Sequence, residues 1–481
     1  MGVSFNAAAL LNGNGIDVQS VVNSILAPEN GSITILQNQQ TDLSTQAGLL
    51  AGLNNNLTSL AQAVLALADP TGPLASQSAT SSDSSILTAS AQTSATPGTH
   101  QIVVSNLATT GTLYTDPLAG GADTTILPSD VTSGDIKLQI GGANGTTEDI
   151  PITQGTNDTL NTLAKYINAQ NWGITASVVT DAGGARLALY SQASGTPGAL
   201  AITDNTTVLT FNAPVGGTNA SLTIDGVPFS SSTNTVSGAI AGVTLNLASA
   251  APGTQVQVTV GPDANQATTA INSFVNAYNA VIGNLNTQFT VDPTTNTEGP
   301  LGGDSGLRSL QSSLLNDVTY SITGNGGLVN LPSLGIDLNN DGTLTVNQVA
   351  TDTHPSLANV LATNPSAVQS FFQNASGTGF ANNFNNDVTN LTDPTNGVIN
   401  VDIAGNTTQQ NALTTQITNL QTNVTAQQAA LTLQFDQVNA TLEAYPSLLL
   451  EVTSEISALN GNYSTPNTTP NTTPTVGVST G

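Results

Sequence analysis

The best candidate for a metal site is the run Asp337-Leu-Asn339-Asn-Asp341-Gly342. Oxygen-bearing side chains at its first, third and fifth positions and a glycine at its sixth are typical of the first half of a calcium-binding loop. The twelfth position is Gln348, however, which lacks the carboxylate that completes such a loop. A polar turn between two strands accounts for the same residues, because Asp-Gly suits a tight turn. We therefore expect a turn here and no metal site.

The two histidines, His100 and His354, could act as general bases only beside a nucleophile. Neither lies in a nucleophile motif such as G-x-S-x-G, and no glycine-rich stretch is followed by the Lys-Ser/Thr of a phosphate-binding loop. The chain has no Cys, which excludes thiol catalysis and disulfides. The neighbouring carboxylates Glu148-Asp149 adjoin a predicted strand and are expected in a solvated turn. We predict two isolated surface histidines, no catalytic residue, no cofactor and no enzyme activity.

Charge is distributed very unevenly in this chain of 481 residues. The net charge is −26, although Asp and Glu number only 30, because Lys and Arg number only 4. Four scattered cations, Lys137, Lys165, Arg186 and Arg308, cannot form the basic groove that nucleic acid requires, nor bind an anionic membrane surface. Such a composition favours an extracellular protein, and an acidic medium is one possible setting for it.

Two further features bear on where the protein is found. No apolar run approaches the roughly 20 residues of a transmembrane helix, so membrane insertion is not expected. The N-terminal stretch MGVSFNAAALLNGNGID has no Lys or Arg and no separate apolar block. It therefore differs from a cleaved secretory signal, and we expect export without one.

The strongest structural pattern is a heptad repeat near each end of the chain, typical of helices that pair along a narrow apolar stripe. The N-terminal repeat consists of Leu36, Leu43, Leu50, Leu53, Leu57, Leu60, Val64 and Leu67, with Gln39 and Gln46 at the position three after the first two leucines. The C-terminal candidate partner consists of Leu413, Ile417, Leu420, Val424, Leu431, Phe435, Val438 and Leu442.

Local signals place the ends of these helices. Asp17 can cap a short helix, which the Glu29-Asn30-Gly31 stretch is expected to break. The long helix then runs from about residue 33 to Ala68, where Asp69-Pro70 stops it. The C-terminal helix is expected to be interrupted at Tyr445-Pro446.

From residue 76 the hydrophobic period changes to two, which predicts strands. Residues 111–214 read as hairpin, helix and hairpin, with the helix capped near Thr156 or Asn157. An Asp225-Gly226 turn predicts a further hairpin, and the strands up to residue 260 are expected to pair with those of 76–110. The α+β module would then be an insertion in a β-rich domain.

These segments predict a multidomain α+β fold with a coiled-coil or helical-bundle leg and a β-rich head of two inserted domains. The expected parts are terminal docking segments (1–35 and 443–481), a helical leg domain (36–75 and 264–442), a β-rich head domain (76–110 and 215–263) and an inserted α+β head domain (111–214). Residues 1–15 and 461–481 offer no periodic apolar face, so both should be flexible.

The whole chain resembles the bacterial flagellar filament capping protein family, also called hook-associated protein type 2. The resemblance rests on the order of several stretches: GNGIDVQSVVNSILAPENGS, ASLTIDGVPF, INSFVNAYNAVIGNLN, LGGDSGLRSLQSSL and LGIDLNNDGTLTVN. A further stretch, TLNTLAKYINAQNWGITASVV, resembles a module shared with flagellins. The terminal helices here carry fewer Lys and Arg than is usual in the family.

The resemblance implies a homo-oligomer at the distal tip of the flagellum, outside the cell, that retains exported flagellin and promotes its polymerisation. It also implies hook-associated junction proteins and an export chaperone as partners. The first filament contact is expected at Val21, Val22, Ile25 and Leu26. Two alternatives are another axial flagellar protein, such as a junction protein or flagellin, and a secreted adhesin with a helical stalk and a β-rich head.

Overall fold

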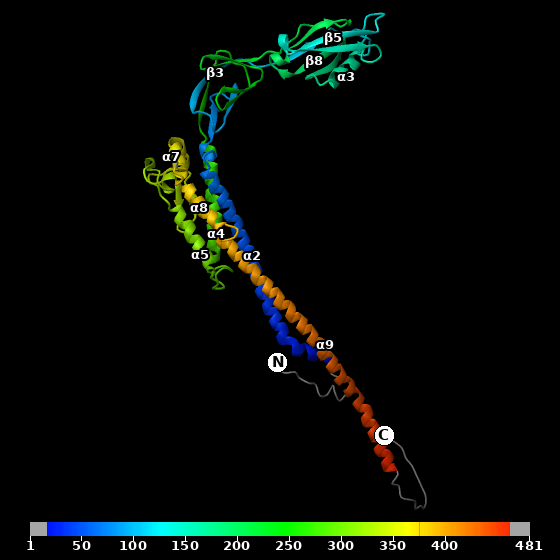
Figure 1. Cartoon of the computed structure of the whole chain (residues 1–481), viewed down its shortest axis with the longest axis vertical. Helices are drawn as coiled ribbons and strands as arrows, with labels where there is room; N and C mark the ends of the chain where they lie inside the picture. Colours follow the sequence, from blue (N-terminus) through cyan, green and yellow to red (C-terminus); the bar gives the residue numbers. More distant parts are fainter. Residues whose placement is uncertain (1–16, 375, 462–481) are drawn as a thin grey trace, which may run out of the picture. The chain divides into compact units, whose positions relative to one another are not determined.

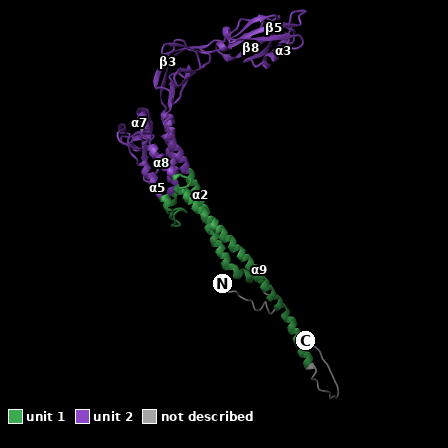
Figure 2. Ribbon diagram, viewed as in Figure 1, with its two compact units in different colours: residues 1–55, 287–308, 391–481 green, residues 56–286, 309–390 purple. Residues whose placement is uncertain are grey.

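The computed structural model describes residues 17–374 and 376–461 (Figure 1). The flexibility predicted for residues 1–15 and 461–481 therefore falls almost entirely outside the described residues. The chain divides into two compact units (Figure 2). Unit 1 comprises residues 1–55, 287–308 and 391–481, and unit 2 comprises residues 56–286 and 309–390. Long helices at both ends and β-sheets between them confirm the predicted α+β class.

Helix α2, Val18–Ala68, is a single helix of 51 residues. The carboxylate of Asp17 accepts bonds from the backbone amide and the hydroxyl of Ser20, at 3.1 and 2.5 Å, so the predicted cap is confirmed. The helix ends immediately before Asp69-Pro70, as predicted. The predicted break at Glu29-Asn30-Gly31 is wrong. Burial of apolar side chains on both sides of this stretch outweighs the roughly 1 kcal/mol that a mid-helix glycine costs.

Helix α9, Val398–Gly461, has 64 residues and continues through Tyr445-Pro446. The predicted interruption is therefore wrong. Proline removes one amide donor from the helix, and a long helix can absorb that loss locally. Beside the proline, the Ser447 hydroxyl donates to the carbonyl of Ala444 at 2.7 Å.

The first β-rich core lies between a five-stranded sheet, β1-β14-β3-β10-β11, and a three-stranded sheet, β12-β13-β2. Its strands are β1 (Gln77–Ser81), β2 (Leu87–Ala91), β3 (Gly98–Asn106), β10 (Ala220–Ile224), β11 (Val227–Ser231), β12 (Thr235–Ile240), β13 (Val243–Leu247) and β14 (Val256–Pro262). Strand β14 pairs with β1 and β3, and β13 pairs with β2. The predicted pairing across the intervening module is thus confirmed, as is the Asp225-Gly226 hairpin between β10 and β11.

The second β-rich core combines sheets β4-β8-β7 and β6-β5-β9 with helix α3. Its elements are β4 (Thr110–Tyr114), β5 (Ser133–Ile140), β6 (Thr146–Thr153), α3 (Leu160–Ala169), β7 (Ile174–Asp181), β8 (Gly184–Ser194) and β9 (Leu200–Asn205). The α3 cap is Thr159, not Thr156 or Asn157, because Thr159 and Thr162 form a reciprocal capping box. Glu148 and Asp149 lie within β6, so the expected turn there is wrong.

The remaining described elements are mostly helical: α4 (Ala264–Phe289), α5 (Ser305–Val318), α6 (Leu357–Thr363), α7 (Pro365–Phe372) and α8 (Phe380–Leu391), with strands β15 (Ile336–Leu338) and β16 (Leu344–Val346). Short 3-10 turns are η1 (Pro73–Ala75), η2 (Gly142–Asn144), η3 (Thr196–Gly198), η4 (Asn325–Gly327) and η5 (Pro332–Leu334). Helices α4, α7 and α8 meet through aromatic rings. Phe274 stacks edge-on to Phe380 and Phe384 at 5.6 and 5.5 Å, and Phe380 lies parallel to Phe371 at 5.4 Å.

Candidate docking surface on the terminal helices

Helices α2 and α9 pair in an antiparallel direction within unit 1. The side chains of Asn406 and Gln410 donate to the carbonyl of Leu43, at 3.1 and 3.3 Å. One turn earlier on α2, Gln40 donates to the hydroxyl of Thr414 at 2.7 Å. The residue numbers of the α9 contacts increase as those of the α2 contacts decrease, so the two helices are antiparallel.

An apolar seam holds the two helices together. Its buried members are Val22, Leu26, Ile33, Ile417 and Val424, and its partly buried members are Val18, Leu36, Leu420, Leu431 and Phe435. Within the described residues, these side chains form a single hydrophobic cluster contributed by both helices. Burying such side chains is the main source of stability for a helix pair that has few charged contacts.

The seam is interrupted by polar side chains. The carboxylate of Glu29 lies between Leu26 and Ile33 in the heptad, and its Oε2 atom is buried with no hydrogen-bond partner. Gln40 occupies the seam four residues after Leu36. The exposed Gln39 does not, although the sequence pattern had favoured it. Unpartnered buried polar atoms cost roughly 1–3 kcal/mol, so this pair is less stable than an all-apolar one.

The predicted α2 heptad residues differ in burial. Leu36 and Leu43 are half-buried, whereas Leu50, Leu53, Leu57, Leu60, Val64 and Leu67 are each 3% exposed or less. Inward-facing positions at the start of α2 alternate in steps of four and three, as at Leu36, Gln40 and Leu43. If this alternation continued, the step after Leu50 would be four residues. The next buried residue is instead Leu53, three residues after Leu50. Such a change of phase rotates the buried stripe around the helix.

The predicted α9 residues follow a gradient. Ile417 and Val424 are buried, while Leu413, Leu420, Leu431, Phe435 and Leu442 are half-buried. Val438 is 47% exposed. The apolar stripe therefore loses its cover towards the end of the helix.

The four residues expected to touch the filament first do not share one environment. Val22 and Leu26 are buried in the seam against α9. Val21 is half-buried and Ile25 is 41% exposed. Of the four residues, only Val21 and Ile25 are accessible on the described surface. Val22 and Leu26 instead contribute to the contact between α2 and α9.

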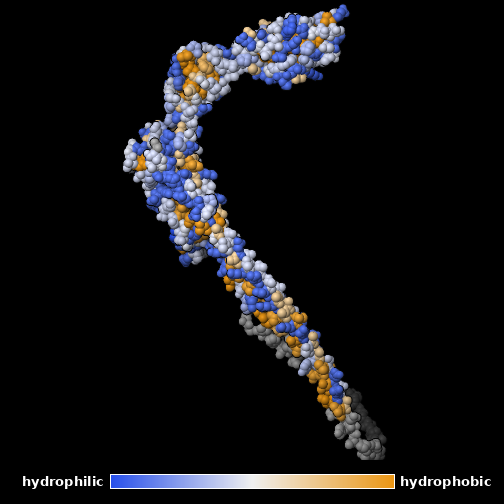
Figure 3. Space-filling view, in the orientation of Figure 1, coloured by the Kyte–Doolittle hydropathy of each residue, from blue (hydrophilic) through white to orange (hydrophobic). Residues whose placement is uncertain are grey.

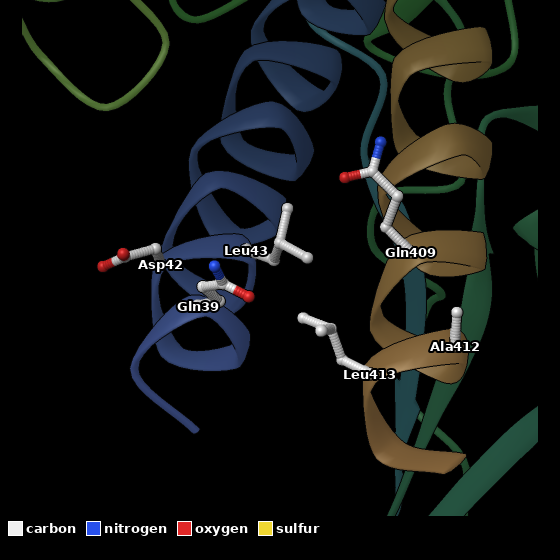
Figure 4. Close-up of a pocket in the computed structure, with 6 residues that line it drawn as sticks. All are labelled: Gln39, Asp42, Leu43, Gln409, Ala412 and Leu413. Carbon is white, nitrogen blue, oxygen red and sulfur yellow. The ribbon is translucent and has the colours of Figure 1, made fainter. Parts of the chain in front are cut away.

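A groove of about 420 Å³ lies beside the seam (Figure 4). It is lined by Gln39, Asp42, Leu43, Gln409, Ala412 and Leu413. Leu43 and Leu413 point toward each other from the two helices, while Asp42 points away (Figure 4). The groove thus has an apolar floor and amide groups at its rim, which is a surface suited to packing and hydrogen bonding and has no charged pair.

The residues considered for chemistry have structural roles. In the β15–β16 hairpin, Asp341 accepts from the amide and hydroxyl of Thr343 at 3.0 and 2.6 Å, so the predicted polar turn is confirmed. The histidines are not isolated as expected, because His100 pairs with Asp225 at 2.8 Å and His354 with Asp337 at 3.1 Å. Across the described ranges, no cluster of three or more His, Cys, Asp or Glu could hold a metal ion.

Two of the cations, Lys137 and Arg308, are likewise paired locally. Lys137 contacts Asp204 at 2.9 Å, and this hydrogen bond raises the pKa of the Lys137 ammonium. Arg308 lies 3.4 Å from Glu298 and stacks on the ring of Phe289 at 4.5 Å. No helix in the described part of the chain is long and apolar enough to cross a membrane.

Comparison with protein families decides the assignment. Residues 14–111 match the family model for the N-terminus of flagellar hook-associated protein 2, and residues 217–446 match the model for its C-terminus. The chain belongs to the flagellar hook-associated protein 2 family. Between these two matches, residues 137–193 match the flagellin hook IN motif. The recognised order of segments is therefore confirmed along most of the sequence.

Individual relatives agree with this assignment. The chain is 26% identical to B-type flagellar hook-associated protein 2 of Pseudomonas aeruginosa over 92% of this chain and 95% of the relative. It is also 26% identical to flagellar hook-associated protein 2 of Escherichia coli, over 65% of this chain and 69% of the relative. Among solved structures, the D1-D2-D3 domains of the flagellar cap protein FliD from Escherichia coli match with a TM-score of 0.56 and 25% identity. That match covers 75% of this chain and 99% of the solved one.

Proposed function

We propose that the chain caps the distal end of the bacterial flagellar filament, where several copies retain exported flagellin and promote its polymerisation. The main support for this proposal is that the N-terminal and C-terminal family models match the chain in the expected order. The similarity to a solved flagellar cap protein supports it further. The same matches favour a cap over a junction protein, flagellin or adhesin. In this role the chain binds flagellin and changes its contacts, without making or breaking covalent bonds. The proposed location is the filament tip, outside the cell.

The α2–α9 pair supports a role in exchangeable contacts. The buried, unpartnered carboxylate oxygen of Glu29 lowers the stability of the seam. A cap must release and regain contacts as each flagellin subunit is added beneath it. Segments of low local stability suit that requirement, because they open at small free-energy cost.

The proposed partners are flagellin and other copies of the same chain. Hook-associated junction proteins and an export chaperone are further proposed partners, and export without a cleaved signal is proposed with them. The docking role of residues 1–35 and 443–481 and of the four-residue set from Val21 to Leu26 also stays a proposal. Val21 and Ile25 are its accessible members, while Val22 and Leu26 maintain the helix pair.

The test separates docking from folding in the native species. A Val21→Ser/Ile25→Ser chain should keep its helical circular dichroism and melting temperature, because neither side chain is buried in the seam. Cells that carry only this chain should shed flagellin into the medium and swim poorly. The matched control is Ser24→Ala/Asn23→Ala, at exposed positions of the same turns, which should leave filaments normal.

Normal filament length and motility with the Val21→Ser/Ile25→Ser chain would overturn this docking assignment. The capping proposal itself is tested in cells from which the gene for the entire chain has been deleted. If cells without the chain still built normal filaments, the proposed function would be wrong.

A further inference from the structure

The last part of α9 carries an apolar stripe longer than the sequence pattern had suggested. Its members are Val438, Leu442, Tyr445, Leu449, Val452, Ile456 and Leu459. Their spacing alternates between four and three residues, which is the heptad spacing of a coiled coil. All of them except the half-buried Leu442 are between 47% and 70% exposed. Figure 3 shows hydrophobic side chains on the surface of this part of α9.

The stripe continues the seam that joins α9 to α2. Leu431 and Phe435 belong to the cluster shared with α2, at the level where Val18 starts that helix. From Leu431 onward the same alternation of four and three continues without a change of phase to Leu459. The face that binds α2 therefore extends for roughly 36 Å beyond Phe435, at 1.5 Å per residue. No described residue covers it.

Acidic residues on this segment lie away from the stripe. With Leu442 and Leu449 at heptad position a, the carboxylates of Asp436, Glu443 and Glu451 fall at the outer positions b or c. Glu455 alone lies at a flanking position. Identical copies aligned in parallel would therefore bring few like charges together, even though the whole chain carries a net charge of −26.

The stripe is apolar at every core position except the amphipathic Tyr445. Position a holds Leu442, Leu449 and Ile456, and position d holds Val438, Tyr445, Val452 and Leu459. Leucine at a with valine at d favours three or four strands, whereas Ile456 at a with Leu459 at d favours two, so these residues fix the face that pairs and not the number of strands. The flanking residues Thr441, Leu448 and Thr453 are uncharged.

We propose that residues 438–459 of α9 form a parallel coiled coil with the same segment of other copies of this chain. A second copy presents the identical stripe in the same register, and its acids face outward. This inference rests on the proposed function in one respect, since both require several copies of the chain side by side. It can be tested with the purified chain alone, so the coiled-coil proposal can be wrong while the capping proposal remains correct.

The absence of Cys from the chain allows a direct test. In the full chain, Val452→Cys places a thiol at a stripe position, and Ser454→Cys places one on the opposite face. A parallel, in-register pair brings equivalent d residues within disulfide reach. Under mild oxidation, the Val452→Cys chain should form intermolecular disulfides at least about tenfold faster than the Ser454→Cys chain.

A second measurement uses light scattering of the full chain. Leu449→Asn/Ile456→Asn should lower the oligomer mass, whereas Ser447→Asn/Ser454→Asn should not. All four side chains are exposed, so both variants should keep their helical circular dichroism. Equal cross-linking at positions 452 and 454, or unchanged mass in both variants, would overturn the proposal. An intramolecular disulfide in a Val3→Cys/Val452→Cys chain would also overturn it, because the chain's own N-terminus would then be the occupant.

Discussion

At the scale of single residues, the least expected feature is a buried carboxyl group, Asp317, beside the half-buried carboxyl of Asp387. Asp317 on α5 is 8% exposed and shares a hydrogen bond with Asp387 on α8. Burial, and then the neighbouring Asp387 carboxyl, raise the pKa of Asp317 from 3.8 to about 8. Its Oδ2 atom has no hydrogen-bond partner, and neither does the hydroxyl of the buried Tyr278 on α4. Asp317 is therefore protonated in the folded chain at neutral pH.

This pair predicts that the fold is more stable in mild acid than in mild base. The unfolded chain loses the Asp317 proton near pH 4, whereas the folded chain keeps it until about pH 8. Stability contributed by the protonated group is full below the lower value and is lost as the pH rises through the upper one. The melting temperature of the transition that unfolds α5 and α8 should fall by roughly 3–10 °C between about pH 5 and pH 8.5.

An Asp317→Asn chain supplies the control, because an amide has no proton to lose. Its melting temperature should change little across the same interval and exceed that of the parent chain at the upper pH. Calorimetry at several pH values measures both. A parent chain that melts at the same temperature throughout, or grows more stable as the pH rises, would contradict the assignment of a raised pKa.

At the scale of elements, the two long helices illustrate how burial outweighs local preference. Helix α2 continues through Pro28 and Gly31 because apolar residues on either side lie in one seam with α9. The same seam tolerates Glu29, whose buried Oε2 atom lacks a partner. Marginal pairing is thus built into the helix that carries the proposed docking residues.

Replacing this carboxylate should stabilise the helix pair. Glu29→Leu removes an unpartnered buried oxygen and adds apolar surface to the seam, so the free energy of unfolding should rise by about 1–3 kcal/mol. Gln37→Leu, at an exposed position of α2, is the control and should have little effect. Hydrogen exchange of the α2 amides measures the opening of the pair. Faster exchange in the Glu29→Leu chain would show that the carboxylate is stabilising.

The later half of α2 should respond differently. Leu57 is 0% exposed, and Leu65 on the same helix is 57% exposed. Leu57→Ala should cost about 2–5 kcal/mol through lost contacts and a cavity. Leu65→Ala should stay within about 0.5 kcal/mol of the parent chain. Denaturant unfolding followed by circular dichroism compares the two, and equal effects would mean that the buried face of α2 is wrongly placed.

At the scale of the whole molecule, separate hydrophobic cores imply separate unfolding events. The core that contains Leu163 and Ile136 and the core that contains Leu245 and Val256 share no buried residue. Chains with several cores rarely unfold in one two-state step. Scanning calorimetry should therefore resolve more than one transition.

Core mutations should identify these transitions. Leu163→Ala should lower the melting temperature of one transition, at a cost of about 2–5 kcal/mol, and leave the others nearly unchanged. Leu245→Ala should lower a different one, which makes each variant the control for the other. A single transition that both variants shift equally would contradict the independence of the two cores.

The sequence by itself determined the features that depend on neighbouring residues. Asp17 capping α2, the stop before Asp69-Pro70 and the Asp225-Gly226 hairpin all follow from short-range hydrogen bonding and backbone sterics. Alternating hydrophobicity predicted the strands on both sides of the intervening module, because period two fixes which face of a strand is buried. Family membership came from the order of such segments.

Only the tertiary structure decided what depends on a distant partner. Continuation of the helices through Gly31 and Pro446 reflects long-range packing and the tolerance of long helices, which local propensity does not encode. Placement of Gln40 in the seam instead of Gln39 depends on the direction from which α9 approaches. The Asp317–Asp387 pair joins residues about seventy positions apart, and its raised pKa arises from burial that no spacing in the sequence reveals.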